Sequence, residues 1–259
     1  MSSKKKITRV DNGGSGSGGS SVPFEASKES KAKANQLRLF AALAWLVAIG
    51  LQMYAIFVLL KPPVNMLWLI GVIAVNLALA ITGSTLWKKA NRLDPASEAD
   101  KTRFFIQNQL GAIMGVLAFL PLVIMIFANK DMDGKQKGIV GSIAVIAMLI
   151  AGITGIDFDP ASIEQYTEQT AKVEMLNEGM NNVFWTKSGN RYHLFSECSY
   201  INTERTDEIF SGTVASAREL KNISDLCSRC QTRAMREKNI TEEDLEAAAQ
   251  RALLESVEN

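Results

Sequence analysis

The chain has 259 residues, of which 47% are hydrophobic, and 28 Lys and Arg face 27 Asp and Glu. This balance hides a division, because residues 1–156 carry 17 basic and 8 acidic side chains and residues 157–259 carry 11 basic and 19 acidic. The hydrophobic residues gather in four blocks instead of the periodic stripes of a soluble α/β enzyme, and three Cys are too few for a disulfide scaffold.

Residues 1–36 are interpreted as a flexible polar leader. Lys-rich stretches lie on both sides of the run DNGGSGSGGSS, whose Gly and Ser residues offer no side chains for a core. A cleaved signal peptide is excluded, since the first apolar block follows this polar stretch and is too long for a signal core.

Four segments have the roughly 20 apolar residues that a helix needs to cross a bilayer core. They cover about residues 37–60, 65–87, 105–128 and 138–157, without a charge in any interior. The alternative is a set of buried helices in a soluble protein, but four consecutive uncharged spans are hard to bury otherwise. We therefore expect a four-helix transmembrane bundle over residues 37–157, followed by a small α+β zinc-binding domain.

Polar groups within the spans are amides and small residues. Two interpretations of the amides stay open: a polar cavity of a transport or channel component, or hydrogen bonds between helices, which we favour. Small-residue pairs predict close helix contacts within the chain, and Pro121 predicts a kink. The amides are Gln52, Asn76, Gln107, Asn108 and Gln109, and the small-residue pairs are Gly111 with Gly115 and Ala151 with Gly155.

The distribution of Lys and Arg predicts the orientation in the bilayer. The leader and the second connection between spans carry 13 of them, whereas the first and third connections carry four. By the positive-inside rule, both termini then lie in the cytoplasm of a bacterial-type cell, and the protein is a multi-pass protein of the inner membrane.

Residues 160–181 are expected to form a stalk helix. Ser162 would cap its start, and apolar residues recur at helical spacing at Ile163, Tyr166, Val173, Leu176 and Met180. The apolar face either packs on the following domain or forms a short coiled coil with a partner protein or a second copy.

Residues 183–238 have the pattern of a small mixed module. The segments VFWTK and RYHLF alternate around Ser188–Asn190 and predict a hairpin, EIFSG predicts a third strand, and Thr213 would cap the helix VASARELK. A last helix over residues 241–259, beginning at Thr241, is expected to pack on this module.

The module contains every Cys of the chain and its only His. His193, Cys198, Cys227 and Cys230 form the pattern H-x4-C-x28-C-x2-C. Three thiols and one imidazole are the ligands of a tetrahedral Zn²⁺ site, and a full set of four predicts a closed, structural site. The alternatives are a redox pair or disulfide at Cys227 and Cys230, which lack the surrounding βαβ pattern, or another metal.

The runs FWTKSGNRYH, SEC, IFSGTVASARELK and LCSRC resemble the Ada-type metal-binding fold over about residues 183–235. The resemblance implies Cys198, Cys227 and Cys230 as ligands. In the repair proteins of that type, the first of four Cys ligands accepts a methyl group from a DNA phosphotriester. His193 occupies that position here, so the resemblance implies the metal site without methyl transfer.

A basic helix face and the missing catalytic patterns complete the sequence evidence. Arg229, Arg233 and Arg236 share one face and could bind phosphates of a nucleic acid, although the acidic balance of residues 157–259 opposes this. We find no nucleophile–base pair, paired catalytic carboxylates or phosphate-binding glycine loop. We therefore expect a non-enzymatic protein in the lipid bilayer whose cytosolic zinc module serves interaction or sensing. The alternatives are a transport component with a regulatory zinc domain and a membrane-tethered nucleic-acid binder.

Overall fold

The structure is a computed structural model that describes residues 5–10 and 24–258, with side chains described up to Glu255. The chain divides into two compact units. The helical unit comprises residues 33–91 and 100–160, and the α+β unit comprises residues 1–32, 92–99 and 161–259.

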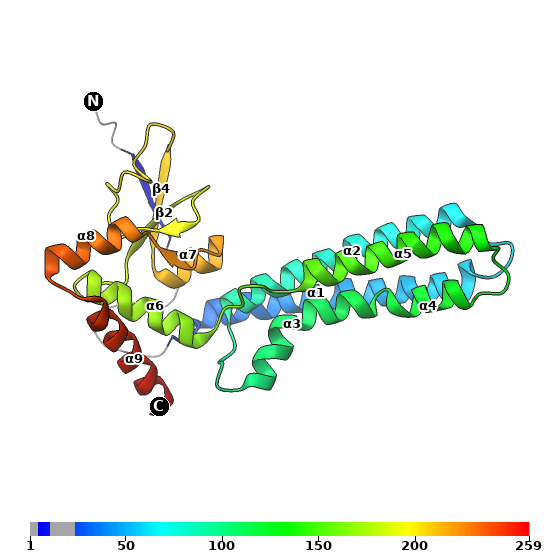
Figure 1. Cartoon of the computed structure of the whole chain (residues 1–259), viewed down its shortest axis with the longest axis horizontal. Coiled ribbons are helices and arrows are strands. Elements are labelled where there is room, and N and C mark those ends of the chain that lie inside the picture. The colour runs from blue at the N-terminus through cyan, green and yellow to red at the C-terminus, as the bar shows by residue number, and fades with distance from the viewer. Residues whose placement is uncertain (1–4, 11–23, 259) are drawn as a thin grey trace. The chain divides into compact units, whose positions relative to one another are not determined.

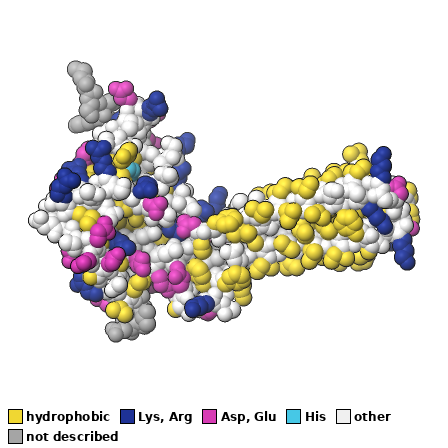
Figure 2. All heavy atoms as spheres, viewed as in Figure 1, with side chains coloured by type: hydrophobic (Ala, Val, Ile, Leu, Met, Phe, Trp, Pro, Cys, Tyr) yellow, Lys and Arg dark blue, Asp and Glu magenta, His cyan; other side chains and the backbone are white. Residues whose placement is uncertain are grey.

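Long apolar helices form the helical unit (Figure 1). Four helical stretches are long and apolar enough to cross a membrane, as the sequence predicted, with α3 and α4 together making one of them. Figure 2 shows apolar side chains along the outside of these helices, with basic side chains at the end where α4 joins α5. The elements are α1 (Lys28–Tyr54), which continues as the π-helical turn η1 (Ala55–Leu59), α2 (Met66–Leu93), α3 (Lys101–Leu117), α4 (Leu120–Ala128) and α5 (Gly134–Gly155).

The third apolar stretch is broken where the sequence contains Pro121. Proline has no backbone N–H and its ring clashes with the preceding turn, so it is tolerated at the first turn of a helix. Here α3 ends at Leu117, Phe119 is the N-cap of α4, and Pro121 lies in the first turn. The expected kink is thus an interruption between two helices.

Small residues set the contact between α3 and α5, as expected from the sequence. A Cβ added at Gly115 would lie 2.7 Å from the carbonyl oxygen of Ala151, and one added at Gly111 would lie 2.9 Å from that of Gly155. Both distances are shorter than a van der Waals contact. The two helix backbones can therefore approach this closely only because glycine has no side chain at these positions.

The expectation of a flexible leader over residues 1–36 is wrong for two of its parts. Residues Lys6–Arg9 form strand β1, and α1 begins at Lys28, nine residues before the apolar block. The early start has a local cause, because the Ser27 hydroxyl accepts a 3.0 Å hydrogen bond from the N–H of Ser30 as an N-cap does. The Gly/Ser run itself lies outside the described residues.

The α+β unit contains two small sheets covered by helices. Strand order is β1-β4-β2 in one sheet, where β1 is parallel and β2 antiparallel to β4, and β3 pairs with β5 in the other. Trp185, Ile209, Ile223 and Leu176 are among the fully buried side chains of its core. The elements are α6 (Ile163–Leu176), β2 (Val183–Thr186), β3 (Arg191–Tyr192), β4 (Glu208–Gly212), α7 (Val214–Lys221), β5 (Asp225–Leu226), α8 (Ser228–Lys238) and α9 (Glu242–Glu258).

The stalk helix expected over residues 160–181 is α6, which is shorter. Ser162 caps it as predicted, accepting a 3.0 Å hydrogen bond from Gln165 N–H, and the left-handed Glu178 and Gly179 follow its end. Its apolar face is buried within the unit against α7, α8 and α9. The face that a coiled coil would need is therefore covered by the chain itself, and the module extends beyond residues 183–238.

Candidate metal centre

The first expected ligand, His193, lies at the end of a short hairpin. Phe184 and His193 exchange two 2.7 Å backbone hydrogen bonds across this hairpin, and its turn is closed by Gly189 N–H bonding to Thr186 O. The alternation that predicted the hairpin therefore places the imidazole on the inward face, where it is 4% exposed.

The Cys227–Cys230 pair is held by the second sheet and the start of α8. Strand β5 pairs in parallel with β3, and Cys227 N–H then bonds to Tyr192 O at 2.8 Å. Cys227 is the N-cap residue of α8, which places Cys230 in the first helical turn. Two residues of β5 carry no strand signal, so the sequence alone did not show how the knuckle is held against the hairpin.

Cys198 starts a tight turn after the hairpin. Its N–H donates to Phe195 O at 3.1 Å, and its carbonyl accepts from Ile201 at 3.0 Å and from Asn202 at 2.8 Å. These bonds fix the backbone on both sides of the thiol, so Cys198 faces the other two thiols.

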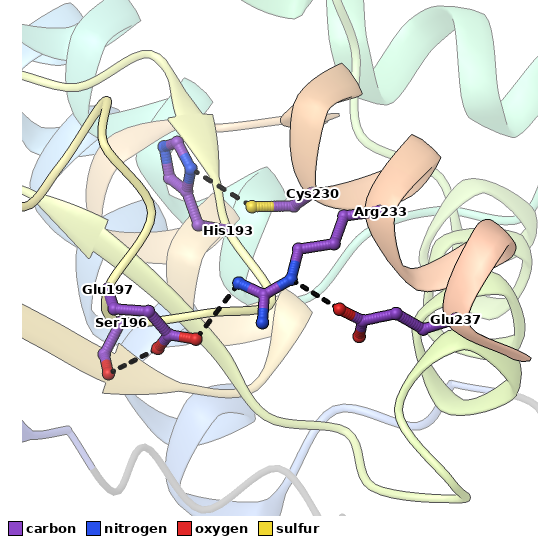
Figure 3. A network of polar contacts seen from close by, with 6 residues as sticks. All are labelled: His193, Ser196, Glu197, Cys230, Arg233 and Glu237. Carbon is purple, nitrogen blue, oxygen red and sulfur yellow. Dashed lines mark hydrogen bonds and ion pairs between the residues drawn. The ribbon is translucent and has the colours of Figure 1, made fainter.

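The fold brings all four expected ligands together. The ligand atoms of His193, Cys198, Cys227 and Cys230 lie within 4.8 Å of one another, all four residues are buried, and the three cysteines are not in disulfides. His193 Nδ1 is 3.6 Å from Cys230 Sγ (Figure 3). This cluster could hold a metal ion, and the disulfide alternative for Cys227 and Cys230 does not occur in the structure.

Burial shifts the pKa values of two of the candidate ligands, His193 and Cys230. Burial, with a smaller effect of Arg191, lowers the pKa of His193 to about 4, so its imidazole is neutral at pH 7. Burial raises the pKa of Cys230 to about 12, although backbone N–H groups of Leu194 and Phe195 at the sulfur oppose this. A buried thiolate is costly without a cation, whereas a bound metal ion would stabilise it directly.

Arg233 connects α8 to the segment between two of the candidate ligands. Its guanidinium lies over the ring of Phe195, 4.1 Å from the centroid. It also pairs with Glu197 at 3.2 Å and with Glu237 at 2.8 Å (Figure 3). The contacts join α8, which carries Cys230, to the segment between His193 and Cys198. The sequence places Arg233 on a basic helix face, and nothing in it identifies Phe195 and Glu197 as the partners of this side chain.

The basic face of α8 borders a cavity of about 550 Å³ lined by Tyr200, Arg229, Arg233 and Arg236, with Ser228, Thr232 and Glu237. Arg229 lies over Tyr200, 5.9 Å from the ring centroid. Because the central Arg233 is already paired with two carboxylates, less of its charge is offered to phosphates than the sequence suggested.

Comparisons of the chain with protein families, with curated proteins and with solved structures give no match. The metal centre therefore rests on its own geometry.

Proposed function

We propose that the protein is a bacterial-type polytopic membrane protein that presents a cytosolic structural-zinc module for interaction or sensing, without enzymatic activity. The observation that carries the proposal is the closed set of four buried ligands. Since four protein ligands complete a tetrahedron, no position remains for a water or a substrate, as a catalytic zinc requires.

The separation between two ligand atoms supports zinc. A thiolate about 2.3 Å and an imidazole nitrogen about 2.0–2.1 Å from Zn²⁺ are about 3.6 Å apart at a tetrahedral angle. Cys230 Sγ and His193 Nδ1 are 3.6 Å apart, so Nδ1 is the nitrogen that would bind. Three thiols also favour Zn²⁺ over Mg²⁺ or Ca²⁺, which prefer oxygen. We also propose that the module is of the Ada type, which is supported by the order of its one His and three Cys residues along the sequence.

The α+β unit is formed by three separate segments of the chain, and this supports a four-span topology. This unit combines the N-terminal segment, the connection between α2 and α3, and the chain after α5. Within it β1 pairs with β4, and Tyr166 donates a 2.9 Å hydrogen bond to Arg92 O. Segments that contact one another share one side of a bilayer, so an even number of crossings must separate them. Two spans lie between each successive pair of segments, and the Lys and Arg bias places that side in the cytoplasm.

Metal analysis of the full-length chain in detergent tests the proposal. We expect one zinc per chain by elemental analysis, and loss of that zinc in Cys227→Ser together with protease sensitivity of residues 161–258. The helical unit should stay resistant in the variant, because it has its own core. Ser224→Ala, a change of similar size outside the ligand set, should retain zinc. A metal-free wild-type chain, or a Cys227→Ser chain that keeps its zinc, would contradict the proposal.

A further inference from the structure

The N-terminal segment forms β1, the outer strand of the sheet with the order β1-β4-β2 (Figure 1). Strand β1 runs parallel to β4, with Lys6 opposite Glu208 and Arg9 opposite Ser211. Val10 N–H continues the ladder with a 2.8 Å bond to Ser211 O. The segment Lys5–Val10 therefore occupies the edge of β4 as an added strand does in β-augmentation.

Three groups beside this edge recognise side chains of the segment. The Lys5 ammonium donates hydrogen bonds to the carbonyl oxygens of Thr203 and Thr206, at 2.7 and 2.6 Å. The Glu208 carboxylate accepts from the Thr8 hydroxyl and pairs with Lys6 Nζ at 3.1 Å. Two cations and a hydroxyl are thus selected at fixed positions along an extended backbone.

The edge of β4 and the Thr203–Thr206 turn are held by contacts that do not involve the N-terminal segment. Strand β4 is paired on its other side with β2, where Val183 lies opposite Gly212. The Thr203–Thr206 turn is closed by its own 3.0 Å backbone hydrogen bond. The edge and its carbonyl oxygens therefore keep their arrangement if the segment leaves.

The segment is held by groups that remain near solvent. No side chain of residues 5–10 is buried, and Ile7 is 51% exposed. Exposed ion pairs such as Lys6–Glu208 contribute little stability, so occupancy depends on the backbone ladder, on the half-buried Val10 that packs against the core, and on covalent attachment.

We infer that the outer edge of β4, with Glu208 and the Thr203–Thr206 turn, is a binding site for an extended lysine-bearing peptide segment, which Lys5–Val10 fills within the chain. The ligand is an extended segment of a partner protein with the pattern Lys-Lys-x-Thr, which displaces the resident strand. This inference rests on the proposed interaction role and identifies its partner surface. The groups that contact the segment are Glu208 and the Thr203–Thr206 turn, which are not among the four candidate metal ligands.

A fluorescent peptide with the sequence of residues 4–10, KKKITRV, tests the site by anisotropy. We expect it to bind a chain lacking residues 2–10 at least tenfold more tightly than the full-length chain, because the resident strand is gone. Glu208→Lys in the shortened chain should weaken binding at least fivefold, and a peptide carrying Lys6→Glu should restore it. Glu243→Lys, a charge reversal on exposed α9, is the matched control.

Two results would overturn the inference. The first is a shortened chain that holds zinc and resists protease but does not bind the peptide. The second is a peptide affinity that does not change with Glu208→Lys in the chain or with Lys6→Glu in the peptide. A wild-type chain without zinc would contradict the proposed function instead. If the shortened chain loses its fold, the full-length chain decides the matter. There Glu208→Lys must speed tryptic cleavage after Arg9 at least fivefold and Lys6→Glu must reverse this, and unchanged cleavage would reject the site.

Discussion

The side-chain amide of Asn76 on α2 donates a 2.7 Å hydrogen bond to the backbone oxygen of Ala118, between α3 and α4. Gln52 on α1 lies at the same break. With its amide turned to the orientation that satisfies both of its atoms, the nitrogen donates to Leu117 O at 3.2 Å and the oxygen accepts from Leu122 N–H at 3.3 Å. Pro121 cannot donate to Leu117 O, so the amides replace bonds that the helix break removes. The two polar residues thus have a structural role as hydrogen-bond partners between helices.

Asn76→Leu should destabilise the helical unit by about 1 kcal/mol, since it leaves the Ala118 carbonyl without its donor in an apolar surrounding. Unfolding of the purified chain by increasing SDS in mixed micelles measures this change. Thr82→Leu is the control, because the exposed Thr82 hydroxyl bonds only within its own helix. Equal stability of the two variants would argue against a structural role for Asn76.

Gly115→Ala should weaken the contact between α3 and α5 by about 1–3 kcal/mol, because the new methyl group would overlap the Ala151 carbonyl. The same substitution at Gly71, where an added Cβ meets no atom within 4 Å, should be neutral or stabilising. The pair of variants can be compared by thermal unfolding in detergent. Similar melting temperatures for both would show that the helices do not approach at Gly115.

Arg233→Ala should speed the loss of zinc to a chelator about fivefold. The substitution removes the ring contact with Phe195 and two exposed ion pairs, one of which joins α8 to Glu197 between the ligands. Competition with a chromogenic chelator gives the rate. Arg236→Ala removes an equal charge one turn away without touching the segment between the ligands, and it should leave the rate unchanged.

Chelation of the metal should release the N-terminal strand. Cys198 begins the turn that leads to Thr203 and Thr206, whose carbonyl oxygens hold the Lys5 ammonium. If the loop loses its metal anchor, these acceptors lose their arrangement, and trypsin should cleave after Arg9 severalfold faster. A chain with Lys5→Ala should already be cleaved faster with zinc bound. Cleavage that is indifferent to chelation would show that strand and metal are uncoupled.

Docking of the N-terminal strand should weaken in acid. The Thr8 hydroxyl and Lys6, with Lys187 nearby, lower the pKa of Glu208 below its ordinary value of 4.5. The ionised carboxylate therefore contributes fully above pH 4.5, and its contribution is lost as the pH falls through the lowered pKa. Anisotropy of a dye on the N-terminal amine should report the release. Glu208→Gln, which cannot ionise, should differ from the wild type above pH 4.5 and converge with it in acid.

Local patterns in the sequence were sufficient to predict the parts of the structure that have local causes. Uncharged apolar runs predicted the four long helices because length and composition decide whether a helix can span a bilayer core. Ser162 and Thr213 predicted helix starts because a cap bonds within three residues. Likewise His193, Cys198, Cys227 and Cys230 were recognisable as a set because ligand type and spacing follow from the chemistry of the metal.

The relationships between distant segments depend on the folded chain and could not be predicted from local patterns. No local pattern in Lys6–Arg9 indicates a strand, because its hydrogen-bond partners lie on β4, about 200 residues later in the chain. Nothing in α8 shows that Arg233 would choose Phe195 and Glu197, since that choice depends on how the hairpin meets the knuckle. The apolar face of α6 could have packed against a partner helix or against helices of the same chain. In the structure it packs against α7, α8 and α9.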